Sequence, residues 1–537
     1  MRSEFDNNVR YKKDQSKYEG TPLWEKKAIG DLVKEWAEKY GDKIAVADSD
    51  EEMSFIELDE LSTKRAYGFL KLGFKQGDMV ILQLPNKNEY AVTFFALMKL
   101  GVIPILALPA HRNTEISGIM DKAEPVAYII ADKYQGFSYL DMARKLKAEK
   151  PFLKHVIVQG NSEEFLNIDD VVAQDGVLPN VDGYETALML LSGGTLGIPK
   201  MIPRSHSDYI YYSKLCVKET KVDENSVFLV ALPAEHNFPM SNPGIIGILN
   251  VGGKIVFCEN PGPDEIFEAI SEHGVTIVSL VPTVVMLCTQ FMDIIDEDEY
   301  DLSSLKILQI GGAMLDITLA DEVISKWPCK LMQVYGTSEG LCCMTDLSDP
   351  DDILRYYQGR KMGDLTEVRI VDTDGNDVPD NTYGEVICRG PFTIDHYYME
   401  PEANMTSFTA DGFYRTGDRA KRTKDGLYHF GGRVKEQINR AGEKIEPAEV
   451  EAFLCSDERI LEAAVAGVKD DELGNRICAF VRCQEGTTVT MENVYELFKK
   501  LEVALYKYPD QLITVDGWPL TKVGKIDKNE LIKIYID

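Results

Sequence analysis

The sequence predicts an α/β protein with a large N-terminal domain of mixed α/β layers, a β-rich subdomain and a small α+β C-terminal domain. Strand-like and helix-like segments alternate up to about residue 350, short strands and turns follow, and a fresh alternation begins at about residue 434. The chain of 537 residues is also too long for one ordinary hydrophobic core, so two or more domains are expected.

The first half of the chain alternates between helical and strand periodicity. Residues 26–40 carry apolar side chains at helical spacing and end at Gly41, which predicts an amphipathic helix. Two more helices are expected at 56–72 and 88–100. Strands are expected at "KIAVAD", "DMVILQL", "VIPILAL", "HVIVQG", "SVFLVAL", "GKIVFC", "TIVSLV", "KILQIGG" and "LMQVYG". Strands that alternate with helices favour βαβ units and a mostly parallel sheet.

After about residue 350 the sequence changes from long alternating helix and strand patterns to short strands separated by turns. The turn-rich stretches "DTDGNDVPDNTYGEV", "TADGFYRTGD" and "TKDGLYHF" indicate β-hairpins. We expect one domain at 1–433 and a second at 434–537, with "GGRVKEQ" as the linker between them. The elements expected in the second domain are a helix at 447–455, strands near 461–468 and 476–483, a helix near 491–503 and a final strand before "TKVGK".

The composition excludes several classes of protein. There are 58 basic and 88 acidic side chains, and a net charge of −30 argues against nucleic-acid binding, which needs a basic face. The first 25 residues are polar, and no apolar run reaches the length of about eighteen residues that a membrane span needs, so we expect neither a signal peptide nor a membrane anchor. The ten cysteines include no C-x-x-C pair, which predicts reduced thiols in a cytoplasmic protein.

The stretch "LLSGGTLGIPKMIPRSH", residues 190–206, is the first candidate for a ligand site. Apolar runs flank it, so we expect strand–loop–strand rather than the strand–loop–helix of a Walker loop. Its glycines allow backbone N–H groups to converge on an anion, and its hydroxyl and ammonium groups would add donors. A glycine-rich hairpin without a ligand remains the alternative. The residues concerned are Ser192, Gly193, Gly194, Thr195, Gly197 and Lys200.

The stretch "QVYGTSEG", residues 333–340, is the second candidate. From Gly336 to Gly340 it fits G-x-S-x-G, the nucleophile elbow of α/β-hydrolases. The following "LCCMTDLSDPDD" does not open a helix, as an elbow requires, so a serine hydrolase acting through Ser338 is disfavoured. Glu339 suits a Mg²⁺ ligand beside a phosphate site, with a solvated loop glutamate as the alternative.

Two shorter motifs complete the candidates. In "YRTGD" we expect Asp418 to close a turn between two strands, where its carboxylate would accept both hydroxyls of a ribose. In "TKVGK" Gly524 allows a tight turn, and Lys525 would reach a developing oxyanion as a mobile charge. An ordinary aspartate turn and a solvated lysine are the alternatives. The seven histidines form no metal-ligand spacing.

Each motif is ambiguous alone, but their order is specific. In sequence they run "SGGTLGIPK", "HNFPMSNPG", "QIGGA", "VYGTSEG", "YRTGD", "GGRVKEQINRAGEK" and "TKVGK". From about residue 25 to Lys525 the chain resembles the adenylate-forming superfamily of acyl-CoA synthetases, nonribosomal peptide adenylation domains and luciferases. Within it, "LALPAHRNTEI", "KMIPRSHSDYIYY", "HNFP" and "KEQINRAGEKI" look like stand-alone 2,3-dihydroxybenzoate–AMP and salicylate–AMP ligases, which feed siderophore or peptide assembly.

The resemblance implies a site for ATP and Mg²⁺. The 192–200 loop would hold the β- and γ-phosphates, and Glu339 would bind the metal ion. The catalytic residues would be Lys525, Glu339 and Arg433, with Lys435 as the hinge of a mobile C-terminal domain and Gly442 lining the path of a thiol. The nucleotide-binding residues would be the loop residues named above and Gly336, Gly312 and Tyr335 by the adenine, Ser338 and Glu339 by the α-phosphate, Asp418 by the ribose, Arg433 near the ribose or a phosphate, and Lys525 at the acid and α-phosphate oxygens.

The resemblance also implies a pocket for an aromatic acid. Asn237 would hydrogen-bond a hydroxyl ortho to the carboxylate, which rejects analogues that lack it. Asn242 stands where relatives carry Ser or Cys, so the pocket would prefer another substituted or heteroaromatic acid. The pocket residues would be His236, Asn237, Phe238, Asn242, Ala313, Val334 and Cys342.

The expected reaction has two steps. Aryl-AMP and pyrophosphate form first, and a thiol from a separate phosphopantetheinylated aryl carrier protein then displaces AMP. Leu196 replaces a Thr of the relatives, which predicts weaker ATP binding by about 1–3 kcal/mol at most. An aryl-CoA ligase that uses coenzyme A and a non-catalytic nucleotide- or aryl-acid-binding paralogue remain the alternatives.

Overall fold

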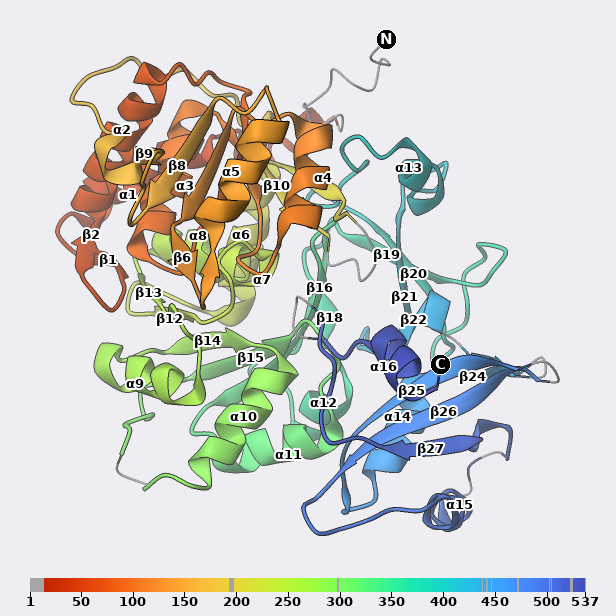
Figure 1. Cartoon of the computed structure of the whole chain (residues 1–537). Coiled ribbons are helices and arrows are strands. Elements are labelled where there is room, and N and C mark those ends of the chain that lie inside the picture. The colour runs from red at the N-terminus through yellow and green to blue at the C-terminus, as the bar shows by residue number, and fades with distance from the viewer. Residues whose placement is uncertain are drawn as a thin grey trace.

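The main sheets of the molecule are two large sheets, one small antiparallel sheet and a separate C-terminal sheet, and two-stranded pairs β6–β7 and β23–β24 accompany them (Figure 1). The prediction of an α/β protein with mixed layers, a β-rich subdomain and a small α+β C-terminal domain is confirmed. The computed structural model describes residues 14–192, 198–296, 299–436, 438–440, 443–445, 447–470, 473–501, 503, 505–521 and 525–536.

The first large sheet has seven strands in the order β11-β10-β4-β3-β5-β8-β9. All its neighbours run parallel except the hairpin β10–β11 at one edge. The strands are β3 (Met79–Gln83), β4 (Ile103–Leu106), β5 (Ala127–Ala131), β8 (His155–Gln159), β9 (Leu166–Asn167), β10 (Thr186–Leu191) and β11 (Met201–Ser205). The helices before β11 are α1 (Ile29–Tyr40), α2 (Phe55–Lys71), α3 (Asn88–Leu100), α4 (Asn113–Ala123) and α5 (Tyr139–Glu149), and a short hairpin joins β6 (Lys133–Tyr134) to β7 (Phe137–Ser138).

The second large sheet has nine strands in the order β18-β17-β16-β15-β14-β12-β13-β1-β2. Its centre is parallel, and β2, β17 and β18 are antiparallel edge strands. The strands are β1 (Ile44–Ala47), β2 (Glu52–Ser54), β12 (Val227–Val230), β13 (Lys254–Phe257), β14 (Ile277–Leu280), β15 (Ile307–Gly311), β16 (Lys330–Thr337), β17 (Leu341–Met344) and β18 (Arg360–Lys361). The helices are α6 (His206–Thr220), α7 (Asn237–Ser241), α8 (Gly244–Val251), α9 (Pro263–His273), α10 (Pro282–Met292), α11 (Ile317–Lys326) and α12 (Asp351–Tyr356).

The hydrophobic core lies between the two large sheets. Helix α3 contacts both β4 of the first sheet and β1 of the second, so it is buried along nearly its whole length. This explains why its sequence is apolar on all sides, whereas α1 is apolar on one face only.

A four-stranded antiparallel sheet follows, as the turn-rich sequence predicts. Its strands are β19 (Glu367–Val371), β20 (Gly384–Arg389), β21 (Tyr414–Arg422) and β22 (Tyr428–Arg433), with α13 (Pro401–Ser407) between β20 and β21. The expectation that Asp418 closes a turn is wrong, because Asp418 lies inside β21. Gly417, with a φ of 71°, accommodates an irregularity of the strand without ending it.

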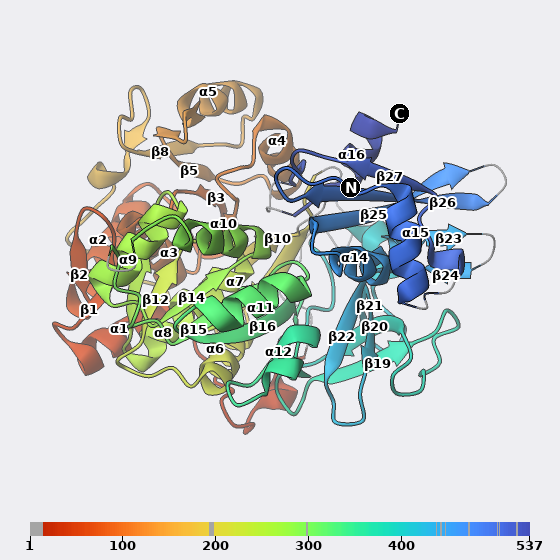
Figure 2. The same ribbon diagram turned by 90° about the horizontal axis from the view of Figure 1, so that it is seen from below.

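The C-terminal part has its own small core on a three-stranded sheet, and it sits beside the β-rich sheet (Figure 2). The helix predicted at 447–455 has those bounds, and the helix predicted near 491–503 ends at Lys500. The elements are β23 (Ile438–Arg440), β24 (Glu443–Ile445), α14 (Pro447–Cys455), β25 (Ile460–Asp470), β26 (Gly474–Cys483), α15 (Met491–Lys500), β27 (Gln511–Thr514) and α16 (Lys528–Tyr535).

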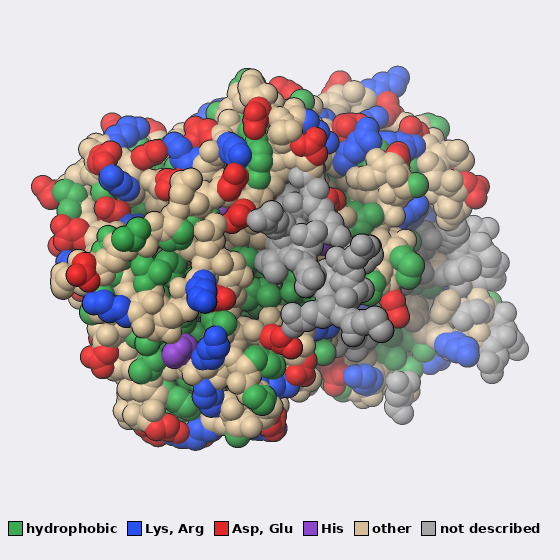
Figure 3. Space-filling view, turned by 90° about the horizontal axis from the view of Figure 1, so that it is seen from above, with side chains coloured by type: hydrophobic (Ala, Val, Ile, Leu, Met, Phe, Trp, Pro, Cys, Tyr) green, Lys and Arg blue, Asp and Glu red, His purple; other side chains and the backbone are tan. Residues whose placement is uncertain are grey.

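Charged side chains of both signs are interspersed over the face of the molecule seen in Figure 3. The net charge of −30 is therefore not gathered into one acidic field on that face. In the part of the chain that the structure describes, no helix is both long and apolar enough to cross a membrane.

Candidate active site

The hairpin β10–β11 frames the glycine-rich loop. The backbone N–H of Ser192 donates to the carbonyl of Lys200 at 3.0 Å, and the Ser192 hydroxyl accepts the N–H of Lys200 at 3.0 Å. The predicted strand–loop–strand arrangement is thus confirmed. The loop tip itself, Gly193, Gly194, Thr195, Leu196 and Gly197, lies outside the described residues.

Lys200 and Glu339 meet on one tyrosine side chain. The ammonium of Lys200 lies 4.5 Å from the centre of the Tyr397 ring, and the Tyr397 hydroxyl donates to Glu339 Oε1 at 2.8 Å. Tyr397 is 3 % exposed, and its hydroxyl also contacts that of Tyr414 at 3.2 Å. Glu339 Oε2 has no hydrogen-bond partner among the described residues, which leaves it available to a cation.

The turn that carries Glu339 joins strand β16 to strand β17. Its backbone is fixed at Gly340, where φ is 115° and an added Cβ would lie 2.0 Å from the carbonyl oxygen of Phe392. Because an antiparallel strand follows Ser338 and no helix does, the nucleophile-elbow geometry is absent here, as the sequence predicts. The backbone of Ser338 is fixed by Arg204, whose Nη1 donates to the Ser338 carbonyl at 3.0 Å.

Asp418 and Arg433 face each other across the β21–β22 hairpin. Arg433 Nε lies 2.7 Å from Asp418 Oδ1, and the Tyr335 hydroxyl donates to Asp418 Oδ2 at 2.6 Å. The Tyr335 ring stacks on Phe430 with centroids 3.4 Å apart, so one ring face is covered and only the other is left for an adenine. The carboxylate is therefore oriented before any ligand arrives.

Lys525 comes to this place from the C-terminal part of the chain. Part of the Lys525 side chain is exposed to solvent, but protein atoms surround much of it. Their exclusion of water, together with the charge of Arg433, lowers the pKa of Lys525. The negative charges of Asp418 and Glu436 act in the opposite direction and raise the pKa of Lys525. The Lys525 backbone N–H donates to Thr521 Oγ1 at 3.1 Å, which braces the turn that presents the side chain.

His236 carries a neutral imidazole near the charge of Lys525. It caps α7, and its Nδ1 accepts the backbone N–H of Phe238 at 3.2 Å, which leaves the proton on Nε2. Burial and the charge of Lys525 lower the pKa of His236 to about 4. The imidazole is therefore uncharged at neutral pH and offers a single N–H.

Asn237 is fixed by hydroxyl groups on its oxygen side. Asn237 Oδ1 accepts the Tyr209 hydroxyl at 2.9 Å and the Ser241 hydroxyl at 3.3 Å, while Nδ2 has no partner among the described residues. Tyr209 is fully buried in α6, and the Arg204 guanidinium lies 4.9 Å from its ring centre.

The other predicted pocket residues lie close to one another. Asn242 Nδ2 donates to Cys342 Sγ at 3.5 Å, and Asn242 Oδ1 is buried without a partner among the described residues. Burial raises the pKa of Cys342 to about 12, so it is a thiol. The Phe238 ring lies against Gly311, where an added Cβ would be 3.2 Å from Cε1, and Val334 pairs with Gly311 in the sheet.

The remaining predicted residues have fewer constraints. Gly312, with a φ of 83°, and Ala313 follow β15 and are exposed. Gly336 pairs with Cys342 across the β16–β17 hairpin. The backbone of Lys435 lies in the short 3-10 helix Val434–Glu436 that follows β22, but its side chain and Gly442 lie outside what is described.

Sequence reasoning missed the residues that orient the site from behind. Arg204, Tyr209 and Tyr397 each touch a predicted residue, but they lie far from it in the sequence. The signal was available for Arg204 only, because a buried arginine in a strand needs a partner, which Asp208 supplies at 2.8 Å.

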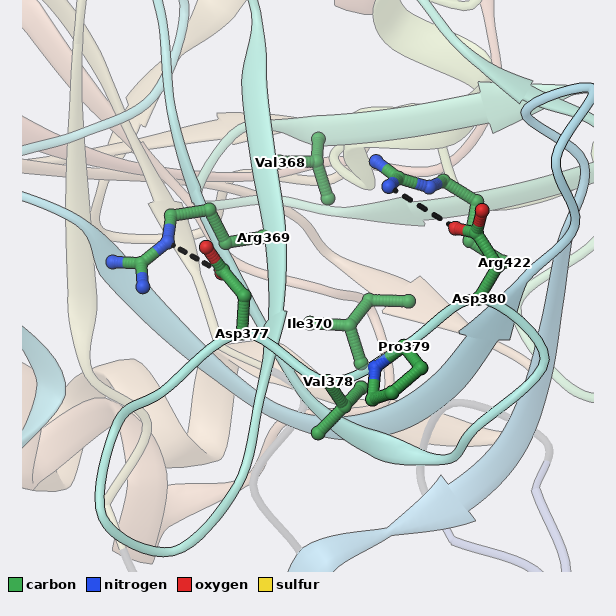
Figure 4. A pocket seen from close by; sticks show the side chains of 8 residues that line it. All are labelled: Val368, Arg369, Ile370, Asp377, Val378, Pro379, Asp380 and Arg422. Atoms are coloured by element: carbon green, nitrogen blue, oxygen red, sulfur yellow. Dashed lines mark hydrogen bonds and ion pairs between the residues drawn. The ribbon is translucent and has the colours of Figure 1, made fainter.

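A cavity of about 180 Å³ lies elsewhere, in the β-rich sheet (Figure 4). Two ion pairs, Arg369–Asp377 at 2.7 Å and Arg422–Asp380 at 3.4 Å, flank it. None of its lining residues belongs to the predicted site, and both ion pairs reach solvent, so we assign no chemistry to it.

Comparison with known families settles the kind of enzyme. The sequence profile of the AMP-binding enzyme family matches residues 33–398, and that of the AMP-binding enzyme C-terminal domain matches residues 449–525. The chain belongs to the AMP-binding enzyme family. The resemblance to the adenylate-forming superfamily is thereby confirmed, and this AMP-binding enzyme is an adenylating ligase of a family that uses ATP.

Relatives of this AMP-binding enzyme have been named by the acids they activate. It is 41% identical over 514 residues to the 2,3-dihydroxybenzoate-AMP ligase of Bacillus subtilis, covering 96% of this chain and 95% of that one. It is 37% identical to a salicyl-AMP ligase / salicyl-S-ArCP synthetase of Mycobacterium tuberculosis, covering 96% and 92%. Its fold matches the apo structure of MbtA from Mycobacterium smegmatis with a TM-score of 0.75, 37% identity and 97% coverage of both chains.

Charged side chains of both signs lie at the candidate site of this AMP-binding enzyme. Three cationic side chains, Lys200, Arg433 and Lys525, surround a site whose carboxylates are Glu339 and Asp418. Within the described ranges, no group of three or more His, Cys, Asp or Glu residues is placed to hold a metal.

Proposed function

We propose that this adenylating ligase activates an aromatic carboxylic acid, 2,3-dihydroxybenzoate, salicylate or a similar acid, and passes the aryl group to the phosphopantetheine thiol of a separate carrier protein. The observation that carries the proposal is that the charge of Lys525 acts on His236, which precedes Asn237, and on the site of the Asp418–Arg433 pair, whose side chains lie 2.7 Å apart. The names of the relatives support the choice of acid.

In the first half-reaction, a carboxylate oxygen of the acid attacks the α-phosphorus of ATP, and pyrophosphate leaves with the electrons of the broken P–O bond. The enzyme contributes position and charge. Lys525 bridges the carboxylate and the α-phosphate oxygens, and the His236 Nε2–H donates to the same carboxylate without adding a charge. Asp418 accepts the ribose hydroxyls while Arg433 holds its carboxylate.

Glu339 is the residue proposed to hold Mg²⁺, through the oxygen that Tyr397 leaves free. The ion, when bound, neutralises the phosphate charge that builds up on pyrophosphate. Lys200 and the backbone of the 192–200 loop bind the same phosphates. The other nucleotide contacts come from Gly312, Tyr335, Gly336 and Ser338.

In the second half-reaction, the domain 434–537 turns about Lys435 relative to the domain 1–433. Lys525 then leaves the site, and the 440–444 loop with Gly442 lines the path of the thiol. The thiol sulfur attacks the carbonyl carbon of aryl-AMP, AMP leaves, and a thioester forms. A motion of this kind lets one site perform two reactions.

A coenzyme A ligase is the second candidate for the same fold. It is motivated by a 37% identical relative named as a 2-hydroxy-7-methoxy-5-methyl-1-naphthoate–CoA ligase of Streptomyces carzinostaticus. The chemistry up to aryl-AMP is the same, and only the thiol differs. Mixing the enzyme that holds aryl-AMP with coenzyme A or with a phosphopantetheinylated aryl carrier protein, and comparing the rates of thioester formation, separates the two.

The first test is ATP–pyrophosphate exchange with a panel of salicylate, 2,3-dihydroxybenzoate, benzoate and 3-hydroxypicolinate. Exchange with an ortho-substituted acid that disappears in Lys525→Ala supports the proposal. A folded wild-type protein that exchanges with none of them, and whose Leu196→Thr variant is equally silent, favours the non-catalytic paralogue instead.

A further inference from the structure

A buried ion pair lies behind the turn that carries Glu339. Neither Arg204, in strand β11, nor Asp208, in the first turn of α6, has exposed side-chain surface. Arg204 Nε and Nη2 lie 2.8 and 2.7 Å from Asp208 Oδ1, and Arg204 Nη1 donates to the Ser338 carbonyl at 3.0 Å. One guanidinium group therefore joins a carboxylate of α6 to the backbone of the turn between β16 and β17.

The Asp208 carboxylate is oriented independently of any ligand. Its Oδ2 accepts the backbone N–H of Ser205 at 2.9 Å, and the Asp208 N–H donates to the Ser205 hydroxyl oxygen at 3.1 Å, which is the capping box of α6. The Ser205 hydroxyl in turn donates to Oε1 of the buried Gln15 at 2.7 Å. A planar guanidinium that bonds this carboxylate along one edge keeps its Nη1 aimed at the Ser338 carbonyl.

The carbonyl that Arg204 bonds belongs to the peptide immediately before Glu339. The Ser338–Glu339 peptide is trans, so its carbonyl and its N–H lie in one plane and point in opposite directions. Fixing the Ser338 carbonyl therefore fixes that plane, which ends at the Cα of Glu339. The Glu339 carbonyl is held as well, because it accepts the N–H of Ile394 at 2.8 Å. The direction in which the Glu339 side chain leaves the backbone is thus set by contacts on both sides of its Cα.

The electrostatics of the pair suit a place near a bound cation. A lone guanidinium behind Glu339 would repel a metal ion, but Asp208 neutralises Arg204 and the pair adds no net charge. Tyr397 donates to Glu339 Oε1 at 2.8 Å, and Glu339 Oε2 has no hydrogen-bond partner among the described residues. The guanidinium therefore acts on the backbone of Glu339 and leaves the charge of its carboxylate to a ligand.

We infer that Arg204, held by Asp208, is a positioning residue for the proposed Mg²⁺ ligand Glu339 and supports the metal-dependent part of ATP binding. The inference rests on the proposed function and adds residues that the proposed reaction does not use. Mg²⁺ requires nearly ideal octahedral geometry, so a small shift of one carboxylate ligand weakens its binding. Residues that orient a metal ligand from behind contribute about tenfold to a hundredfold to metal affinity.

The test measures binding of α,β-methylene-ATP, which cannot transfer its AMP group, by calorimetry, once with Mg²⁺ and once with EDTA. Arg204→Met/Asp208→Asn removes both charges together, so no unpaired charge stays buried, and the asparagine keeps an acceptor for the Ser205 N–H. We expect its affinity for the analogue to fall about tenfold or more relative to the wild type with Mg²⁺, and to stay at the wild-type value with EDTA.

The matched control removes a buried ion pair elsewhere in the core. The Arg65 side chain, which is 2 % exposed, pairs with Glu89 between α2 and α3 and also donates to the Thr93 hydroxyl at 3.3 Å. Arg65→Met/Glu89→Gln loses a pair of the same kind but keeps the contacts of the Glu339 turn, so its affinity stays at the wild-type value in both solutions. A general loosening of the core would instead lower the affinity of both double variants.

Arg204→Lys is the second variant, in case the double variant does not fold. It keeps a cation opposite Asp208, but a single ammonium group lacks the planar fork that bonds a carboxylate and a carbonyl at once. We therefore expect the same loss of affinity with Mg²⁺ and the same wild-type affinity with EDTA.

Three results overturn the inference. They are an unchanged affinity with Mg²⁺ in the Arg204 variants, an equal loss with Mg²⁺ and with EDTA, and an equal Mg²⁺-dependent loss in Arg65→Met/Glu89→Gln. None of these measurements uses an aromatic acid, whereas the proposed function fails when no acid supports pyrophosphate exchange in the wild type. The two failures are therefore distinguishable.

Discussion

Tyr397→Phe removes one hydroxyl from behind the proposed metal ligand and leaves everything else in place. The phenylalanine ring still fills the buried site and still lies under the ammonium of Lys200, so the cation–π contact is kept. What is lost is the donor to Glu339 Oε1 at 2.8 Å and the contact with Tyr414. The variant therefore isolates the orientation of one carboxylate.

The expected loss follows from the kind of hydrogen bond removed. A hydrogen bond to a charged group contributes about 1.5–3 kcal/mol. At 1.4 kcal/mol for each factor of ten, Tyr397→Phe raises the Mg²⁺ concentration needed for half-maximal rate of the first half-reaction by about tenfold to a hundredfold. Because the carboxylate itself remains, raised Mg²⁺ restores most of the rate. Glu339→Gln, which removes the charge, is not restored.

The assay is pyrophosphate exchange across a Mg²⁺ titration, together with binding of Mn²⁺ to the enzyme–ATP complex measured by electron paramagnetic resonance. The matched control is Tyr139→Phe, which removes a buried hydroxyl that donates to the carbonyl of Pro109 at 2.6 Å and not to Glu339. Its stability loss is comparable, but its metal dependence is not altered. Unchanged Mg²⁺ and Mn²⁺ titrations in Tyr397→Phe, with Glu339→Gln impaired, would refute the role given to the hydroxyl.

Three further predictions follow from the structure. Lys525→Ala abolishes pyrophosphate exchange but still converts supplied aryl-AMP to thioester. In the wild type, kcat/KM for ATP falls as the pH rises and Lys525 loses its proton; because the pKa of Lys525 is lowered, this fall is centred below pH ~10.4, where an exposed lysine titrates. A fall centred at or above that pH would contradict this. Burial lowers the pKa of His206 to about 3, so the folded state needs this imidazole neutral. The free energy of unfolding therefore drops by about 2 kcal/mol between pH 6.5 and pH 5, where the unfolded chain takes up the proton. In urea titrations His206→Asn, which keeps an acceptor for the Ile29 N–H, flattens this pH dependence. Gly340→Ala lowers the free energy of unfolding by about 2–4 kcal/mol, because φ is 115° and its Cβ would meet a carbonyl at 2.0 Å; an unchanged Tm would contradict the strain.

The sequence was most informative where periodicity reports burial. The helix at 447–455 and the alternating strands of both large sheets were predictable, because each element repeats its contacts at a fixed spacing. The local reading of Asp418 failed, because a glycine before an aspartate signals a turn as well as it signals an irregular strand. Only the neighbouring strands β20 and β22 decide between the two.

The candidate site divides in the same way. Motif order identified the residues that would face the ligands, since their spacing in the chain is characteristic of the family. The partners behind them, Tyr209 for Asn237 and Tyr397 for Glu339, come from other elements and carry no local pattern. Such contacts depend on how helices and sheets pack, which a single sequence does not encode at any fixed separation.

The hairpin β21–β22 holds Asp418 opposite Arg433, and the proposed hinge at Lys435 lies just beyond the end of that hairpin. On the proposed function, a rotation that begins after Arg433 would carry Lys525 away while the Asp418–Arg433 pair stays where it was. The nucleotide half of the reactive anhydride would then remain anchored while its surroundings change from those suited to one chemistry to those suited to the other. The intermediate would not have to be released and recaptured, and leakage of free aryl-AMP into water would be slow relative to its capture by the thiol.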